Sequence, residues 1–401
     1  MTLASMVSSM PGRDYAPFAY GFRPFFWLVG AFALVAMLAW LGMVSTGFSP
    51  LPRLPAMLWH GHEMLFGLVG AAIAGFMLTA VPSWTGARGF AGMPLVLLVL
   101  VWLAGRLTFA FAAFVPPALV AICELAFLPA LACLIGPPLL RSRNRNTPLL
   151  FVLLAIWLSD VAFTVALMRG DGMLASSALL AAIDIVLLLI TVIGGRIVPA
   201  FTASALRTRG LATDLRGSRW ADGIAIGAMI AVIVLDVFAP RTRAAGIVAA
   251  VAAIAHFWRL GGWQTRRTLR EPLVWCLHLA YAWMAVGLTM KAVQLLAGTA
   301  WSAHWLHALT VGAAASMIVA VMTRAALGHT GRPLVAAGSI AFAYLLLSLA
   351  AMVRAFLPSL GVVEYRWTLM LAGALWLAAF AIFLIKYTPI LMRPRIDGRP
   401  G

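Results

Sequence analysis

Charge is the scarcest property of this 401-residue sequence. Only 10% of the residues are charged, whereas 63% are hydrophobic and the mean hydropathy is +1.00. Soluble domains carry roughly a quarter of their residues as charges, so the composition excludes a soluble globule. It predicts an all-α integral membrane protein that forms a single polytopic domain over residues 1–401.

Negative charge is even scarcer than positive charge. The 12 acidic residues face 29 basic ones, which gives a formal net charge of +17. Such a balance could indicate a nucleic-acid partner, but the basic residues lie in short clusters between long apolar runs. About 20 of the 29 fall on one side of the predicted membrane spans. Because positive loops face the cytoplasm, the asymmetry predicts that both termini are cytoplasmic, and we expect no nucleic-acid partner.

Cysteine is also rare, and its spacing excludes several kinds of site. The three cysteines form no CxxC or CxxCH motif, so we expect no disulfide framework, zinc site or covalently attached haem. We expect the three cysteines, which lie within apolar spans, to be small core residues: Cys123, Cys133 and Cys276. We also expect no cleavable signal peptide before the first apolar run, which begins near Phe25.

Long apolar runs are what the sequence has in abundance. A helix needs about 20 apolar residues to cross a bilayer, and twelve runs of this kind can be placed. The predicted spans are 25–47, 58–81, 92–114, 118–140, 148–168, 173–203, 221–239, 244–262, 271–297, 302–326, 333–356 and 363–387. We expect residues 1–24 to form a cytoplasmic N-terminal segment and residues 388–401 a cytoplasmic tail.

A faint internal repeat connects the second, sixth and tenth spans. Shifting the second span by 245 positions places His62 on His307 and Gly67 on Gly312. If the repeat is real, the bundle consists of three four-helix arcs with a pseudo-threefold arrangement, as in the catalytic subunits of haem-copper oxidases. The alternative is a chance similarity between helices rich in alanine and leucine.

Histidine carries most of the polar chemistry within the spans. The predicted topology sorts the seven histidines by depth: His60, His62, His304 and His307 near the outer face, and His256, His278 and His329 in the cytoplasmic half. Two groups at two depths are consistent with two sites. The competing interpretation is that a histidine near a helix end is an interfacial polar residue, and this interpretation is stronger for His256 and His329, which lie beside arginines.

Helical geometry separates the outer histidines. His60 and His62 lie about 200° apart around their helix, so they cannot easily bind one metal but could serve two neighbouring sites. His304 and His307 share a face, which suits one small cation or a ligand and its supporting partner. The repeat makes His62 and His307 equivalent, and two imidazoles facing each other across a bundle are what a haem iron accepts.

Buried acidic residues are the next most informative group. Glu63 lies one turn from His60, while Glu124, Asp160 and Asp184 interrupt apolar spans. A carboxylate in such a place is protonated, paired with an arginine, or part of a proton route. In the sixth span, the sequence 194–199 (GGRIVP) predicts either a backbone opening toward a cavity or a kink with an arginine that reaches the interface.

Several motifs together give the chain a family resemblance. They are Phe22-Arg23-Pro24-Phe25-Phe26, Trp59-His60-Gly61-His62-Glu63-Met64-Leu65-Phe66-Gly67, Leu78-Thr79-Ala80-Val81-Pro82-Ser83-Trp84-Thr85-Gly86, Gly194-Gly195-Arg196-Ile197-Val198-Pro199-Ala200-Phe201-Thr202, Leu277-His278-Leu279, His307-Ala308-Leu309-Thr310-Val311-Gly312 and Gly328-His329-Thr330-Gly331-Arg332-Pro333. With these motifs the chain resembles the NnrS family of bacterial twelve-helix membrane proteins, described as containing haem and copper and linked to nitric oxide metabolism. The resemblance implies a multi-pass protein of the bacterial inner (plasma) membrane.

The resemblance also implies cofactors and partners. We expect haem b and copper, with His62, His307 and His278 as the candidate haem ligands. The candidate copper ligands are His60 and His329, which lie within the motifs, and His304, which lies outside them and rests on its position beside His307; His278 is the alternative to His304. Nitric oxide and membrane lipid are the expected partners, together with an electron donor that is a quinol or a redox protein.

Three functions remain open at this point. In a nitric oxide reductase-like oxidoreductase, two nitric oxide molecules, two electrons and two protons would give nitrous oxide and water, with Glu63 delivering protons. In a non-catalytic haem protein, nitric oxide would be bound, buffered or sensed without turnover. A transporter of a metal or small molecule would have no chromophore at all.

Overall fold

The computed structural model describes residues 15–49, 51, 55–215 and 217–398. Within these residues every regular element is a helix, and twelve helices are long and apolar enough to cross a membrane. The prediction of an all-helical protein with twelve spans is therefore confirmed. Of the two predicted terminal segments, residues 1–14 and 399–401 lie outside the described residues.

The first six spans follow the predicted ranges closely. They are α2 (Phe22–Thr46); α3 (Ala56–His62) with η1 (Glu63–Val69) and α4 (Gly70–Thr85); α5 (Met93–Ala110); α6 (Pro117–Leu125) with α7 (Phe127–Arg141); α8 (Leu149–Arg169); and α9 (Gly172–Thr208). The uncharged turn around Pro116 and Pro117 does separate the third span from the fourth, because α6 begins at Pro117.

The last six spans complete the bundle. They are α10 (Arg219–Phe238); α11 (Arg243–Gly261); α12 (Pro272–Ala297); η3 (Ala300–Ser302) with α13 (Trp305–His307), η4 (Ala308–Ala315) and α14 (Ser316–His329); α15 (Gly338–Leu360); and α16 (Tyr365–Met392). A short helix, η2 (Thr265–Thr268), precedes α12.

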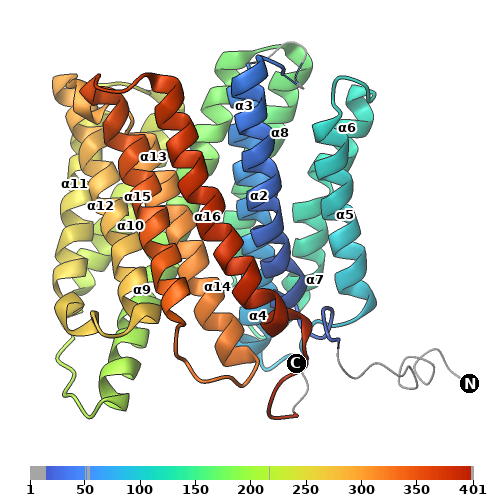
Figure 1. Ribbon diagram of the computed structural model, residues 1–401, viewed down its shortest axis with the longest axis vertical. Coiled ribbons are helices and arrows are strands. Elements are labelled where there is room, and N and C mark those ends of the chain that lie inside the picture. The colour runs from blue at the N-terminus through green and yellow to red at the C-terminus, as the bar shows by residue number, and fades with distance from the viewer. Residues whose placement is uncertain (1–14, 50, 52–54, 216, 399–401) are drawn as a thin grey trace, which may run out of the picture.

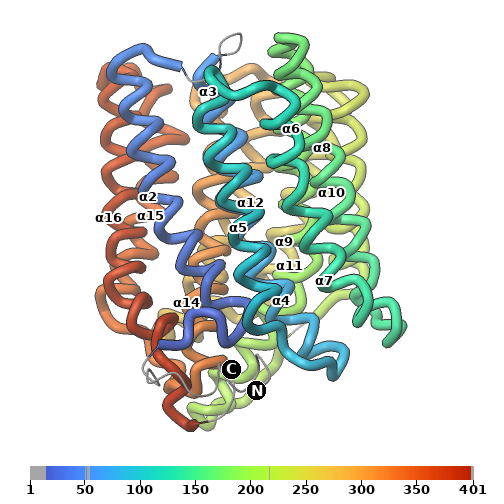
Figure 2. Tube along the Cα trace, turned by 90° about the vertical axis from the view of Figure 1, so that its right-hand side faces the viewer, coloured from blue at the N-terminus to red at the C-terminus, as the bar shows by residue number. Residues whose placement is uncertain are grey.

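The first and last spans lie side by side and bring the chain ends together. Helix α2 packs against α16, and the start of α2 and the end of α16 lie at the lower end of the bundle (Figure 1, Figure 2). The Ala16 N–H donates a hydrogen bond of 2.7 Å to the Met392 carbonyl. Two ends at one side follow from an even number of spans, whereas the cytoplasmic placement of that side stays a prediction.

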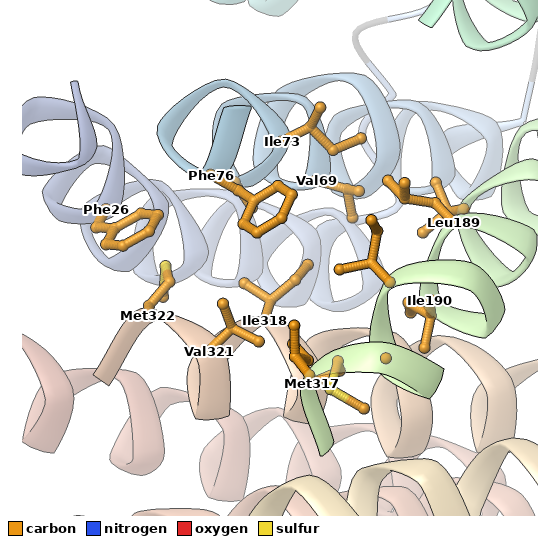
Figure 3. A pocket seen from close by; sticks show the side chains of 15 residues that line it. Phe26, Val69, Ile73, Phe76, Leu189, Ile190, Met317, Ile318, Val321 and Met322 are labelled. Atoms are coloured by element: carbon orange, nitrogen blue, oxygen red, sulfur yellow. The ribbon is translucent and has the colours of Figure 1, made fainter. Parts of the chain in front are cut away.

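The second, sixth, ninth and tenth spans are the most deeply buried. The most apolar stretch of the second span is 78% buried, compared with 28% for that of α2. The second, sixth and tenth spans also meet around one apolar cavity (Figure 3). The threefold arrangement of arcs stays a prediction, and the burial of the ninth span is a feature that it does not explain.

A shared irregularity supports the internal repeat. The second and tenth spans each contain a π-helical segment, η1 (Glu63–Val69) and η4 (Ala308–Ala315), and the two begin 245 residues apart. Each segment directly follows a histidine, His62 or His307. Because π-helical turns are rare and concentrate at functional sites, the same turn at equivalent positions marks both histidines as candidates.

The sixth span does not open as one of our two interpretations expected. Helix α9 is continuous through Gly194 and Gly195. The missing side chain at Gly195 makes room for Arg259, since a Cβ there would collide with the guanidinium. Arg196 donates a hydrogen bond of 2.7 Å to the Asn146 side chain. The two glycines therefore permit helix packing rather than a break in the backbone.

Candidate functional site

The half of the bundle away from the start of α2, which the predicted topology makes the outer half, holds two polar sites on opposite faces of one helix (Figure 1). Helix α3 (Ala56–His62) carries both His60 and His62, and its last residues point in two directions, as the predicted 200° separation requires. His60 lines cavities toward the tenth, eleventh and twelfth spans. His62 is completely buried among the third, fourth and fifth spans.

Two adjoining cavities contain His60 and His307. Their volumes are about 240 Å3 and about 440 Å3. Six residues line both of them: Met37, Met57, His60, His307, Val311 and Trp376. The Trp40 ring stacks on the His60 ring with 4.7 Å between centroids. The buried His60 Nδ1 has no hydrogen-bond partner among the described residues, so this imidazole keeps a nitrogen for another group.

Two arginines give the larger cavity a positive wall. Arg354 and Arg366 both line it, beside Tyr365. The Arg354 Nη2 donates a hydrogen bond of 2.7 Å to the Tyr365 hydroxyl, whereas its buried Nη1 has no partner within the described part of the chain. A buried guanidinium with an unused donor favours a carboxylate or phosphate nearby.

His304 lies outside these cavities although it is on the same span as His307. Its ring lies 6.3 Å from the Tyr365 ring between centroids, and it is not among the described residues that line either cavity. The spacing of three residues therefore places His304 near His307 without bringing it to His60. Its predicted role as a metal ligand stays a prediction.

His62 belongs to a buried cluster of ionisable side chains. The His62 Nε2 lies 3.3 Å from the Asp160 Oδ1 and 3.6 Å from the Glu124 Oε1. These three donor atoms lie within 4.8 Å of one another and could hold a metal ion. Metal–ligand bonds of about 2.0–2.2 Å place neighbouring tetrahedral ligands about 3.3–3.6 Å apart, so the observed spacing fits.

A second layer supports the three candidate ligands. The His62 Nδ1 lies 3.2 Å from the Glu63 Oε1, as in the carboxylate–histidine–metal arrangement that orients an imidazole. Arg106 donates to both Glu63 and Glu124. Glu63 is thus engaged by two partners, and its predicted role in proton delivery stays a prediction.

Aromatic rings close the cluster off from lipid and water. The His62 ring stacks on Phe109 with 3.9 Å between centroids, and Phe66 and Phe163 lie 4.9 Å and 4.6 Å away. Gly105 allows close approach, since a Cβ there would lie 3.3 Å from a Glu124 carboxylate oxygen. Electrostatic interactions in such a dry pocket are stronger than in water.

The half of the bundle near the start of α2 and the end of α16, which the predicted topology makes the cytoplasmic half, holds His278 and His329 in contacts of another kind. Both nitrogens of His278 are hydrogen-bonded, to Thr202 at 2.8 Å and to Thr265 at 2.9 Å. The ring of His329 stacks on Tyr20 with 6.1 Å between centroids and lies beside Phe22. The structure therefore brings neither of these histidines together with the outer ones, and their predicted ligand roles stay predictions.

The main residues that sequence reasoning did not assemble are Arg106 and Arg354. Both were within predicted spans, and an arginine within a span is a signal of a buried partner. Glu124 and Asp160 did stand out as buried carboxylates, but nothing in a single sequence indicates that two separate helices, α6 and α8, bring them to His62. We predicted that His62 and His307 share one haem. In the structure, however, His60 lines the two cavities with His307, and His62 is not among the described residues that line them.

Comparison with known proteins agrees with the motifs. The family described as NnrS protein matches residues 16–395, which is nearly the whole described chain. None of the curated proteins compared with the chain matches it. The family is linked to the response to nitric oxide. The chain belongs to the NnrS family of membrane proteins.

Proposed function

We propose that this chain is a haem- and copper-binding membrane protein of nitric oxide metabolism. The observation that carries the proposal is the placement of His60 and His307 in adjoining cavities at the outer end of the bundle. Cavities of about 300–1,000 Å3 are typical for cofactors. Imidazole is a common ligand of haem iron, and the unpartnered Nδ1 of His60 is consistent with a missing ligand bond.

The charges of the larger cavity also fit haem b, which carries two carboxylates. Arg354 and Arg366 are positioned to pair with such carboxylates, and Arg354 has a buried donor with no partner among the described residues. When bound, haem b supplies a one-electron redox centre. In this proposal His60 and His307 hold the iron, Trp40 fixes the His60 ring, and the arginines set the orientation.

The second metal belongs to the cluster around His62. Three carboxylates (Glu63, Glu124 and Asp160) and one guanidinium (Arg106) leave two negative charges, which one divalent cation would neutralise. One imidazole and two carboxylates suit Cu(II) and other divalent ions, whereas Cu(I) prefers sulfur ligands. His62, Glu124 and Asp160 would hold the ion, Glu63 would orient His62, and the phenyl rings would exclude water.

A small apolar cavity is consistent with nitric oxide as the ligand. It has a volume of about 80 Å3, and the side chains around it, such as Phe76, Ile190 and Met317, are apolar (Figure 3). It shares Val69 and Val186 with the smaller cavity beside His60. Dry apolar cavities accept small uncharged molecules, and nitric oxide is one.

Two centres on one helix favour redox chemistry as the second candidate. His60 and His62 are two residues apart, so electrons could pass between a haem and a metal held by them. Reduction of nitric oxide then needs an outside electron donor. Binding without turnover needs only the haem cavity.

The test uses purified protein in detergent with its haem and metal content measured. Reductant and nitric oxide are added, and nitrous oxide is followed over time. Repeated turnover supports reduction, whereas a stoichiometric uptake of nitric oxide without nitrous oxide supports binding alone. Protein that lacks both a visible chromophore and bound metal would contradict the proposal and favour a transporter.

A further inference from the structure

A second buried ionisable cluster lies among the sixth, seventh and ninth spans. It consists of Asp184 in α9, Asp236 in α10 and Lys291 in α12, and all three side chains are at most 5% exposed. None of these helices contributes a donor to the site around His62. The cluster also does not line the two cavities beside His60, within the described residues.

Lys291 forms a hydrogen-bonded ion pair with one of the two carboxylates, Asp236. The Lys291 Nζ donates to the Asp236 Oδ2, and it lies 4.9 Å from the centroid of the Trp305 ring. Both carboxyl oxygens of Asp184 are buried without a hydrogen-bond partner among the described residues. Asp184 lies beside the Asp236 carboxyl, and a hydrogen bond between two carboxyls requires a proton on one of them.

Within the described residues, the cation that acts on Asp184 is Lys291. Helix α9 packs against α3, η1, η2, η4, α8, α10 and α12. Of the charged groups on these elements, Lys291 and Asp236 are the ones that act on Asp184. With all three groups ionised, the cluster would carry one uncompensated negative charge inside the membrane, which is a costly arrangement.

We propose that Asp184, Asp236 and Lys291 form a proton-binding site that holds one proton shared by the two carboxyls. In the arrangement described here, Lys291 pairs with ionised Asp236 and the proton is on Asp184. In the alternative arrangement, the Asp184 O–H bond breaks and an O–H bond forms on Asp236. The ammonium then pairs with Asp184, and the net charge of the site stays zero throughout.

This site is independent of haem and copper, so it can be tested without them. Infrared difference spectra of detergent-purified protein at neutral pH compare the wild type with Asp184→Asn. The expected difference is the loss of one C=O stretching band of a protonated carboxylic acid. The matched control is Asp171→Asn, which removes an exposed carboxylate that caps the start of the same helix. Asp171→Asn should remove a band of an ionised carboxylate rather than a band of a protonated carboxylic acid.

Lys291→Gln examines the same site without changing either carboxyl group. Without the ammonium, Asp236 should bind a proton of its own, so that the site holds two protons and the spectrum gains one carboxylic acid band. This variant tests the site even if Asp184→Asn fails to fold. Replacing choline chloride with sodium chloride should leave the wild-type band unchanged. The proposal is overturned if Asp184→Asn removes a carboxylate band, if Lys291→Gln adds no acid band, or if sodium abolishes the band and so marks a metal-cation site.

Discussion

His60, in the half of the bundle that is predicted to face outward, and His278, in the half that is predicted to be cytoplasmic, use their ring nitrogens in opposite ways. In the outer half, His60 keeps a ring nitrogen without a partner among the described residues and lines a large cavity. In the cytoplasmic half, two threonines hydrogen-bond both nitrogens of His278, and aromatic rings pack around His329. Both kinds of histidine lie within family motifs, so motif membership does not distinguish a ligand from a packing residue.

What distinguishes them is the state of the ring nitrogens. A buried imidazole with satisfied nitrogens contributes to stability, whereas one with a spare nitrogen facing a cavity or a carboxylate cluster can bind a metal. By this criterion, His60 and His62 are candidate ligands and His278 is a structural residue. His256 does not follow the division into halves, because its buried Nε2 also has no hydrogen-bond partner among the described residues.

The largest expected effect is on haem. His307→Ala should abolish haem binding, because loss of a ligand costs more than the about 10–100-fold that loss of a supporting partner costs. The measurement is the ratio of haem to protein after purification, together with the visible spectrum. His278→Ala is the control from the cytoplasmic half and should keep full haem content. Equal loss of haem from both variants would remove the contrast between the two halves.

The second effect concerns the buried metal. His62→Ala should remove the metal from the cluster of His62, Glu124 and Asp160, while Glu63→Gln should weaken it by about 10–100-fold by losing the orienting carboxylate. Metal analysis and Cu(II) titration measure both variants. Glu271→Gln, which changes a carboxylate at the cytoplasmic end, serves as the control. Unchanged metal affinity in His62→Ala would exclude this cluster as the metal site.

A smaller effect is expected from the partners of His278. Thr202→Val removes the hydroxyl that bonds the Nε2 of His278. It should lower stability by about 0.6 kcal/mol and at most about 1.7 kcal/mol, as found for hydrogen bonds between helices of a membrane protein. Thermal unfolding in detergent measures this change. Haem and metal contents should stay at wild-type values. A loss of haem without a loss of stability would show that His278 has a ligand role after all.

The smallest effect is expected at the interface of the chain ends. His329→Ala removes the ring that stacks on Tyr20 with 6.1 Å between centroids. A long aromatic contact of this kind contributes about 0.5 kcal/mol, so the unfolding temperature should fall only slightly. Copper content should not change, and a clear loss of copper from this variant would support its predicted role as a metal ligand.

Most of the fold could be predicted from the sequence because the bilayer sets a strict length and polarity for each span. The twelve runs matched twelve helices, and the turn near Pro117 was placed correctly. Of the two interpretations of Gly194 and Gly195, a break in the backbone is not what the structure shows, because α9 is continuous there, although Gly195 and Pro199 do line a cavity. A glycine pair signals close approach of backbone or side chain, and only the structure shows that Arg259 fills the space.

The candidate site was less predictable. The opposite directions of His60 and His62 follow from helix geometry alone, and this part could be worked out. Whether His60 or His62 faces the tenth span depends on how the second span is rotated about its own axis. Packing against the other helices sets that rotation. The joining of Glu124, Asp160 and Arg106 around His62 depends in the same way on four helices that are distant in sequence.

One comparison on a single helix tests the central claim most directly. His60→Ala and His62→Ala are purified in parallel, and haem content and the visible and electron paramagnetic resonance spectra are recorded for each. The structure predicts that His60→Ala loses the haem, whereas His62→Ala keeps the haem and its spectrum. The opposite result, with haem retained in His60→Ala and lost in His62→Ala, would contradict the assignment of the cavity between His60 and His307.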